Sequence, residues 1–157
     1  MKIILRRARP NDWLQLKELF KNIWVEHRPL FLKIDPSFRE FANKKPSKKR
    51  FLEKLQSQEM RLAVALDGPR LIGYSFVHIQ KEKNPLIVIG CLTQIYLLPE
   101  YRGKGIADML WNDALVWFKK KKVDYLQLSV AINNKRAIEV YKKWGFKPFL
   151  SLMRKKF

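Results

Sequence analysis

The sequence has a single cysteine, Cys91, among 157 residues, and acidic side chains are also scarce. One cysteine excludes a disulfide within the chain and any metal site built from several cysteines. No apolar run is long enough to span a membrane, and the run that starts at Ile3 is too short for a signal peptide. No internal repeat or low-complexity segment is visible. We therefore expect a cytoplasmic protein without a membrane segment or a metal site.

The shortage of acidic residues leaves a large positive charge, because 33 Lys and Arg stand against 14 Asp and Glu, a net charge of +19. Such a field attracts polyanions, so RNA, an acidic protein surface and a phosphate-bearing cofactor are candidate partners. A lysine-rich solvated surface without a dedicated partner explains the same composition, and a second copy of the chain is a further candidate partner. Hydrophobic residues make up 47% of the chain, which is typical of a folded core, and the length suits one domain over residues 1–157.

The stretch from Leu97 to Ala107 is the most informative part of the chain. An apolar run ends there at Pro99 and is followed by a basic, glycine-rich turn, Arg102-Gly103-Lys104-Gly105. An amphipathic helical pattern begins at once with Ile106. Glycines let backbone N–H groups converge on an anion, and a helix start adds free donors and a favourable dipole. The pattern predicts a phosphate-binding turn, with an ordinary strand-to-helix turn as the alternative.

Hydrophobic periodicity and turn residues predict the other elements. Strands are expected over 3–8, 61–66, 71–80, 86–98, 125–130 and 146–153, and helices over 12–28, 47–58, 105–121 and 134–144. Pro99 cannot donate to a ladder, so backbone pairing should lapse near Leu97 and Leu98. The proline-broken segment 29–47 is expected to form a lid or a plain connector. The order predicts an α/β (α+β) fold with a mixed, mostly antiparallel sheet flanked by helices.

Two motifs in register resemble a known family. The first is Leu97-x-Pro99-x-x-Arg102-Gly103-x-Gly105-Ile106-Ala107, and the second is Asn134-x-x-Ala137-x-x-x-Tyr141-x-x-x-Gly145-Phe146. They resemble the acetyl-CoA motif and the following helix motif of the GNAT superfamily of N-acetyltransferases. The resemblance extends more loosely to the helix start at Arg9-Pro10-x-Asp12 and the hairpin with Ile72-Gly73-Tyr74. It implies a single GNAT-like domain whose central strands splay apart.

The resemblance also implies roles for individual residues in the transfer of an acetyl group from acetyl-CoA to a primary amine. The pyrophosphate of CoA would bind to backbone N–H groups of the glycine turn, and the pantetheine arm would fill the gap beside the splayed strand. The cofactor-binding residues it implies are Ile95, Leu97, Arg102, Gly103, Lys104, Gly105, Ile106, Ala107, Asn134 and Tyr141. The catalytic ones are Leu97, whose N–H would stabilise the oxyanion, and Tyr141, the general acid for the departing thiolate. The helical pattern by itself, without the resemblance, would predict a core residue at Tyr141 and a helix cap at Asn134.

The chain departs from the family pattern in two places. Glu100 stands where the family often has Gln or Arg, and no Asp or Glu occurs from Leu86 to Pro99, where family members often carry the general base. The candidate bases are a water held by Gln94 or Ser129, or one of Glu26, His27 and His78. The alternative for each of these side chains is a purely structural or surface role.

The acceptor amine is left open by the sequence. The family binds acceptors through the variable region that corresponds to residues 24–55, which is basic and aromatic here. The positive charge disfavours polyamines and aminoglycosides unless Glu26, Asp35, Glu40 or Glu53 forms an acidic pocket. It favours an amine on an anionic carrier, such as an acidic peptide or a ribosomal component. Two other functions stay open, a basic nucleic-acid-binding module and a GNAT fold that binds CoA without turnover.

Overall fold

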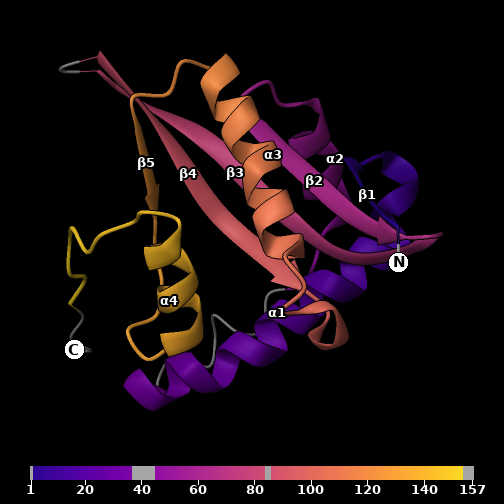
Figure 1. Ribbon diagram of the computed structural model, residues 1–157, viewed down its shortest axis with the longest axis horizontal. Coiled ribbons are helices and arrows are strands. Elements are labelled where there is room, and N and C mark those ends of the chain that lie inside the picture. The colour runs from indigo at the N-terminus through magenta and orange to yellow at the C-terminus, as the bar shows by residue number, and fades with distance from the viewer. Residues whose placement is uncertain (1, 37–44, 84–85, 154–157) are drawn as a thin grey trace.

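The computed structural model describes residues 2–36, 45–83 and 86–153, and its strands form one five-stranded sheet in the order β1-β2-β3-β4-β5 (Figure 1). The strands are β1 (Ile3–Arg7), β2 (Met60–Asp67), β3 (Arg70–Lys83), β4 (Leu86–Leu97) and β5 (Tyr125–Leu128). Neighbouring strands are antiparallel except β4 and β5, which are parallel. The predicted mixed, mostly antiparallel sheet is therefore confirmed.

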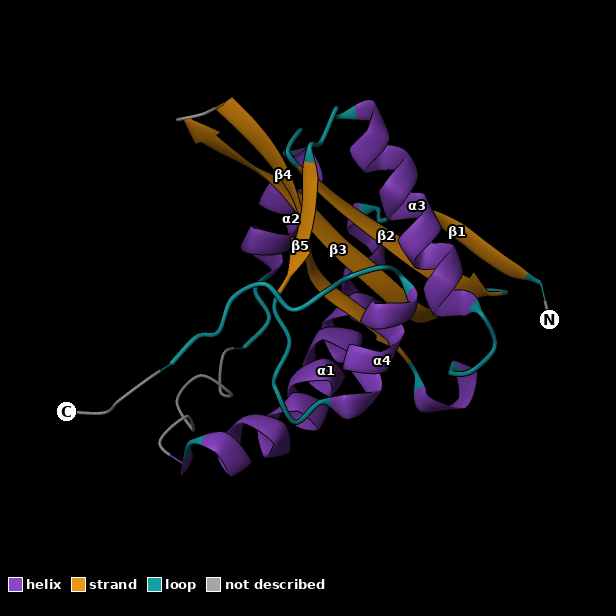
Figure 2. Cartoon of the chain, turned by 60° about the vertical axis from the view of Figure 1, so that its left-hand side comes forward, coloured by secondary structure: helices purple, strands orange, loops and turns teal. Residues whose placement is uncertain are grey.

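Helices lie on both faces of this sheet (Figures 1 and 2). α1 (Trp13–Ile34) and α2 (Lys48–Gln56) pack on one face, and α3 (Ile106–Lys120) packs on the other. α4 (Lys135–Lys143) adjoins α3 through an aromatic cluster, in which the rings of Trp111 and Trp144 stack at 5.1 Å. Short 3-10 turns at Pro10–Asp12 and Pro99–Tyr101 precede α1 and α3. No helix in the described ranges combines the length and the apolar character that crossing a membrane requires.

The alternation of side chains along β2 shows how the two layers are formed. Leu62 and Val64 are buried against α1 and α2, whereas Ala63 and Ala65 between them are buried against α3. Successive side chains of a strand point to opposite faces, so one strand contributes to both cores. The small alanine side chains leave room for Ile106 of α3, which is only 1% exposed. The start of α3 is thereby fixed against the sheet.

The predicted end of the first helix near His27–Pro29 is wrong. α1 continues through Pro29 to Ile34, although a proline inside a helix removes one backbone hydrogen bond. The helical turn beyond Pro29 is contacted by a residue from a distant part of the chain, since Asn133 Nδ2 donates to the Leu30 carbonyl at 2.8 Å. The predicted lid over 29–47 is therefore partly helix, and its residues 37–44 lie outside the described residues.

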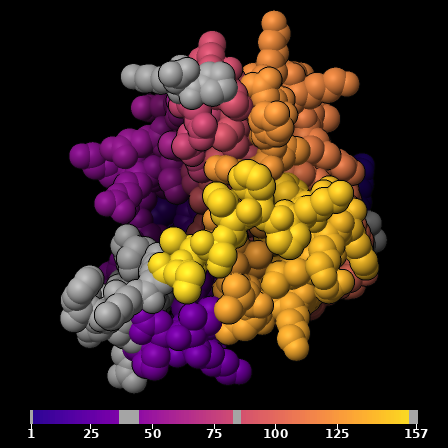
Figure 3. All heavy atoms as spheres, turned by 90° about the vertical axis from the view of Figure 1, so that its left-hand side faces the viewer, coloured from indigo at the N-terminus to yellow at the C-terminus, as the bar shows by residue number. Residues whose placement is uncertain are grey.

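The predicted closing strand over 146–153 is also wrong. Gly145 ends α4 in the left-handed region at φ 88°, and Pro148 cannot donate to a ladder. The segment pairs with no strand, and its apolar side chains Phe149, Leu150, Leu152 and Met153 are all at least 80% exposed. Figure 3 shows this yellow segment on the outside of the molecule, beside the gold α4. β5 is also shorter than expected, since it ends at Leu128.

Candidate active site

A gap opens between β4 and β5 because the two strands pair over only four residues. Ile89 to Leu92 of β4 pair with β5, but β4 itself runs on to Leu97. The predicted splaying of the central strands is thus confirmed. On its other edge β4 stays paired with β3, since Leu97 lies opposite Gly73 and the Leu98 N–H donates to the Ile72 carbonyl at 2.9 Å. The expected lapse of pairing near Leu97 and Leu98 is therefore wrong for the β3 edge.

A β-bulge lies where the gap begins. Phe76 of β3 faces Gln94 whereas Val77 faces Leu92, so Thr93 is an extra residue in β4. Bulges bend a strand and increase its twist, and the pairing of β4 with β5 ends at Leu92, directly before this bulge. The Thr93 hydroxyl lies 2.8 Å from His78 Nδ1, which links the bulge to β3.

The backbone of β4 presents two donors to this gap. Groups on an antiparallel strand point alternately to its two sides, and the Leu98 N–H is bonded to β3. The N–H groups of Leu97 and Ile95 therefore point to the opposite side, where β5 no longer pairs with β4. The structure thus places the backbone of these two predicted site residues along the gap.

The glycine turn lies at the end of the gap, in front of α3. Gly103 and Gly105 have φ of 73° and 75°, a backbone conformation that residues other than glycine rarely adopt. A Cβ at either position would meet nothing within 4 Å. The first helical bond of α3 joins the Met109 N–H to the Gly105 carbonyl at 3.1 Å. The N–H groups of Ile106 and Ala107 have no carbonyl partner within the helix. An open turn with free donors at a helix N-terminus suits an anionic group such as a phosphate.

The basic side chains of the turn differ in their surroundings. Lys104 is exposed, and its Nζ lies 5.5 Å from the centre of the Tyr101 ring. The Arg102 guanidinium is turned back toward β4 and α1, where Nε donates to the Leu97 carbonyl at 2.8 Å and Nη2 donates to both Glu26 oxygens at 2.7 and 2.8 Å. Glu100, which departs from the family pattern, accepts a hydrogen bond from Arg70 at 2.9 Å, so its carboxylate forms an ion pair at the surface.

The second motif contributes Asn134 and Tyr141. Asn134 caps α4, because its Oδ1 accepts the Ala137 N–H at 3.3 Å, which confirms the cap. The Tyr141 ring packs against Trp144 and Phe146 at 5.7 and 6.3 Å, in the same apolar cluster as Ile95. Burial raises the pKa of Tyr141, so its hydroxyl carries a proton at neutral pH. No described residue makes a hydrogen bond to this hydroxyl.

The candidate bases lie in different places. Burial lowers the pKa of His27, whose ring contacts Phe31, and burial also lowers the pKa of His78 beside the β4 bulge. Both imidazoles are therefore mostly neutral at pH 7 and able to accept a proton. The side-chain oxygen Oε1 of Gln94 accepts a hydrogen bond from the Tyr74 hydroxyl at 3.2 Å, and Ser129 is exposed.

Glu26 lies close to the end of β4, because its carboxylate also accepts the hydroxyl of Tyr96 at 3.0 Å. Tyr96 is a site residue that the sequence did not indicate, since 70 positions separate it from Glu26 and no local motif joins them. Among the described residues, no group of three or more His, Cys, Asp and Glu side chains is arranged to hold a metal ion.

Comparison with known proteins matches residues 15–146 to the Acetyltransferase (GNAT) family, and the chain belongs to this family. The putative [ribosomal protein bS18]-alanine N-acetyltransferase of Bacillus subtilis is 37% identical over 87 residues, which are 55% of this chain and 53% of that protein. An N-alpha-acetyltransferase of Saccharolobus solfataricus is 32% identical over 107 residues, 62% of each chain. The chain thus spans only 53% and 62% of the length of these two relatives.

The fold is shared with solved structures over nearly the whole chain. A mutant of the BH1408 protein from Bacillus halodurans superposes with a TM-score of 0.84 at 18% identity, covering 98% of this chain and 99% of that one. The aminoglycoside N-acetyltransferase AAC(6')-Iy in complex with CoA has a TM-score of 0.76 at 17% identity, covering 99% and 95%. At such low identity these likenesses show the GNAT fold alone.

Proposed function

We propose that the protein transfers the acetyl group of acetyl-CoA to a primary amine by direct attack. The observation that carries this proposal is the β4–β5 gap, with the N–H groups of Ile95 and Leu97 along one side and the open glycine turn at its end. The pantetheine arm would take the place of the missing strand, and the pyrophosphate would bind at the N-terminus of α3.

We assign the chemical steps to the residues that the family resemblance implies. The amine nitrogen attacks the thioester carbon, and the Leu97 N–H stabilises the negative charge that develops on oxygen. Loss of such a donor costs about 3 kcal/mol of transition-state stabilisation. The C–S bond then breaks, the thiolate takes the proton of the Tyr141 hydroxyl, and the amine loses a proton to a base or to solvent. Holding the two reactants together supplies much of the rate.

We further propose that the acceptor is an amine on an anionic carrier, such as an acidic peptide or a ribosomal component. The net charge of +19 favours such a carrier over small polycations. Glu26, a candidate for an acidic pocket, is already paired with Arg102, and Glu40 lies outside the described residues. The Bacillus subtilis relative is named for an alanine of a ribosomal protein, which agrees with this choice.

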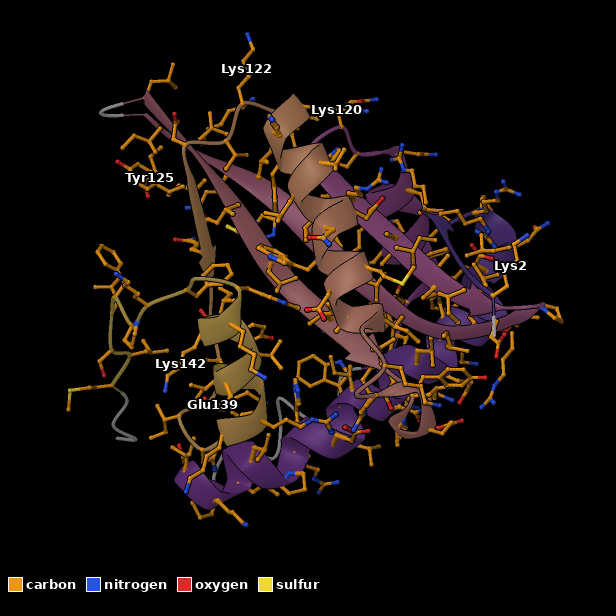
Figure 4. The ribbon with its side chains drawn as sticks, in the orientation of Figure 1. Lys2, Lys120, Lys122, Tyr125, Glu139 and Lys142 are labelled. Atoms are coloured by element: carbon orange, nitrogen blue, oxygen red, sulfur yellow. The ribbon has the colours of Figure 1, made fainter. Side chains whose placement is uncertain are left out.

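We also propose an organisation and macromolecular partners for this chain. Residues 1–157 would form one domain that acts in the cytoplasm, and RNA, an acidic protein or a second copy would be its macromolecular partner. Lys120 and Lys122 lie at the C-terminal end of α3, the opposite end of this helix from the glycine turn (Figure 4). An anionic surface could therefore bind there without blocking the glycine turn.

The test is calorimetric binding of acetyl-CoA, followed by CoA release across a panel of small amines and acidic peptides. We expect binding, and release with the acidic peptides. Release with small polycations alone would refute the proposed acceptor, and binding without release would leave a CoA-binding protein without turnover. Absence of binding, together with RNA affinity that falls steeply with added salt, would favour the nucleic-acid module.

A further inference from the structure

One group of contacts joins the end of β4 to α1 through side chains. The Arg102 guanidinium lies across the Tyr96 ring at 5.3 Å, and both side chains contact the Glu26 carboxylate. The pair is partly shielded from water, because the side chains of Arg102 and Glu26 are 21% and 40% exposed. Three residues from two parts of the chain thus form one unit, which we call the Glu26 clamp (Glu26, Tyr96 and Arg102).

The clamp acts on the peptide group that follows Leu97. Its carbonyl accepts from Arg102 Nε at 2.8 Å, and its N–H, that of Leu98, donates to Ile72 at 2.9 Å. The peptide is therefore held from both edges of β4. On the gap side, where β5 would otherwise supply the partner, Arg102 takes that place. The arginine can do this only while its other end is held, and Glu26 holds it with two short bonds.

We propose that Glu26 is a positioning residue, which acts through Arg102 to fix the Leu97 backbone at the acetyl-transfer site. This inference rests on the proposed function. It gives Arg102 a role in orienting the strand edge rather than in binding phosphate directly. It also couples α1, whose second half belongs to the variable acceptor region, to the strand that lines the cofactor gap. Neither side chain exchanges a proton in this proposal, since Glu26 stays a carboxylate and Arg102 stays a guanidinium throughout.

The chain offers a matched control for this ion pair. Arg61 of β2 donates to both oxygens of Asp113 of α3 at 2.8 and 2.7 Å, and both side chains are 23% exposed. Like the clamp, this pair has two short arginine–carboxylate bonds and is partly shielded from water, although here Nε and Nη2 each bond one oxygen. Neither of its side chains hydrogen-bonds to β4 or to the glycine turn among the described residues. Asp113→Asn therefore measures the loss of a bidentate ion pair that has no positioning role.

The experiment compares Glu26→Gln, Arg102→Lys, the double variant and Asp113→Asn. We expect kcat to fall about tenfold in each clamp variant, because small displacements of reacting groups are costly. Acetyl-CoA affinity should change little. Thermal stability should fall no more than it does in Asp113→Asn. The double variant should fall no further than either single one, because both remove the same support. Lysine cannot replace the planar fork that reaches the carbonyl and the carboxylate together.

Three outcomes would overturn the proposal. An unchanged kcat in Glu26→Gln excludes positioning, and additive losses in the double variant separate the two residues. A large loss in Glu26→Gln with full activity in Arg102→Lys, and loss of the acid limb of the pH–rate profile, would make Glu26 a general base instead.

A readout without turnover separates this inference from the proposed function. Burial, with the hydrogen bond and charge of Glu26, raises the pKa of Tyr96 to about 12. Glu26→Gln should lower that pKa in an ultraviolet titration, with Tyr96→Phe identifying the signal. If the wild type transfers no acetyl group but this pKa moves, the Glu26–Tyr96 contact of the clamp exists and the proposed function fails. If the pKa does not move, the clamp itself is absent in solution.

Discussion

Substitution of Gly103 by aspartate tests the phosphate site most directly. A Cβ at Gly103 would point into open space, so the new carboxylate would displace no atom of the protein. It would instead stand where the free N–H groups of α3 begin. Gly68 in the β2–β3 turn is a matched position, since its φ is 57° and its Cβ would also meet nothing within 4 Å. Gly68→Asp therefore reproduces the backbone cost without the site.

The expected effect follows from Coulomb's law. A carboxylate about 4 Å from a phosphate charge costs about 1 kcal/mol in bulk water and about 4 kcal/mol at the dielectric of a protein surface. Acetyl-CoA should therefore bind between about fivefold and about 10³-fold more weakly to Gly103→Asp. Both variants should lose roughly 1 kcal/mol of unfolding free energy, because aspartate tolerates the left-handed conformation better than most residues but less well than glycine.

Calorimetry at two salt concentrations gives the decisive comparison. The weakening should be larger at low salt, since screening reduces the repulsion. Gly68→Asp should bind acetyl-CoA as the wild type does. Equal affinity in wild type and Gly103→Asp would refute the assignment of this turn to the pyrophosphate, and equal weakening in both variants would show a general effect of charge or stability.

Two further predictions concern catalysis and folding. Tyr141→Phe should lower kcat in steady-state assays while acetyl-CoA affinity is kept, and an unchanged kcat would remove the hydroxyl from the mechanism. Asp12→Asn should destabilise the fold by about 1 to 3 kcal/mol at pH 7 in urea unfolding, because the carboxylate accepts two bonds from Arg6 at 2.7 Å. Burial raises the pKa of Asp12, but the bonds from Arg6 and the Arg9 N–H outweigh it and hold the pKa below its ordinary 3.8. The stabilisation is thus complete above pH 3.8 and is lost as the pH falls through the folded-state pKa, so the variants should converge in acid.

The local elements followed from periodicity because each depends on neighbours in the chain. The helix that starts at Ile106 and the turn with Gly103 were both predicted, because a buried helix face requires apolar residues at helical spacing and a positive φ favours glycine. The end of α1 did not follow in this way. Pro29 signals a break locally, but the helix continues, and its last part is contacted by Asn133, more than a hundred residues away.

Some features of the candidate site depend on the local sequence, and others depend on contacts between distant segments. The sequence by itself determined the glycine turn, the cap at Asn134 and the family, because these are short patterns with a local physical cause. The gap beside Leu97 was implied by the family resemblance, but only the tertiary structure decided where it begins, since β4 pairs with β5 no further than Leu92, and that Arg102 turns back to Glu26. Strand pairing and ion pairs between distant segments depend on which backbones meet in space, and no spacing along the chain encodes that.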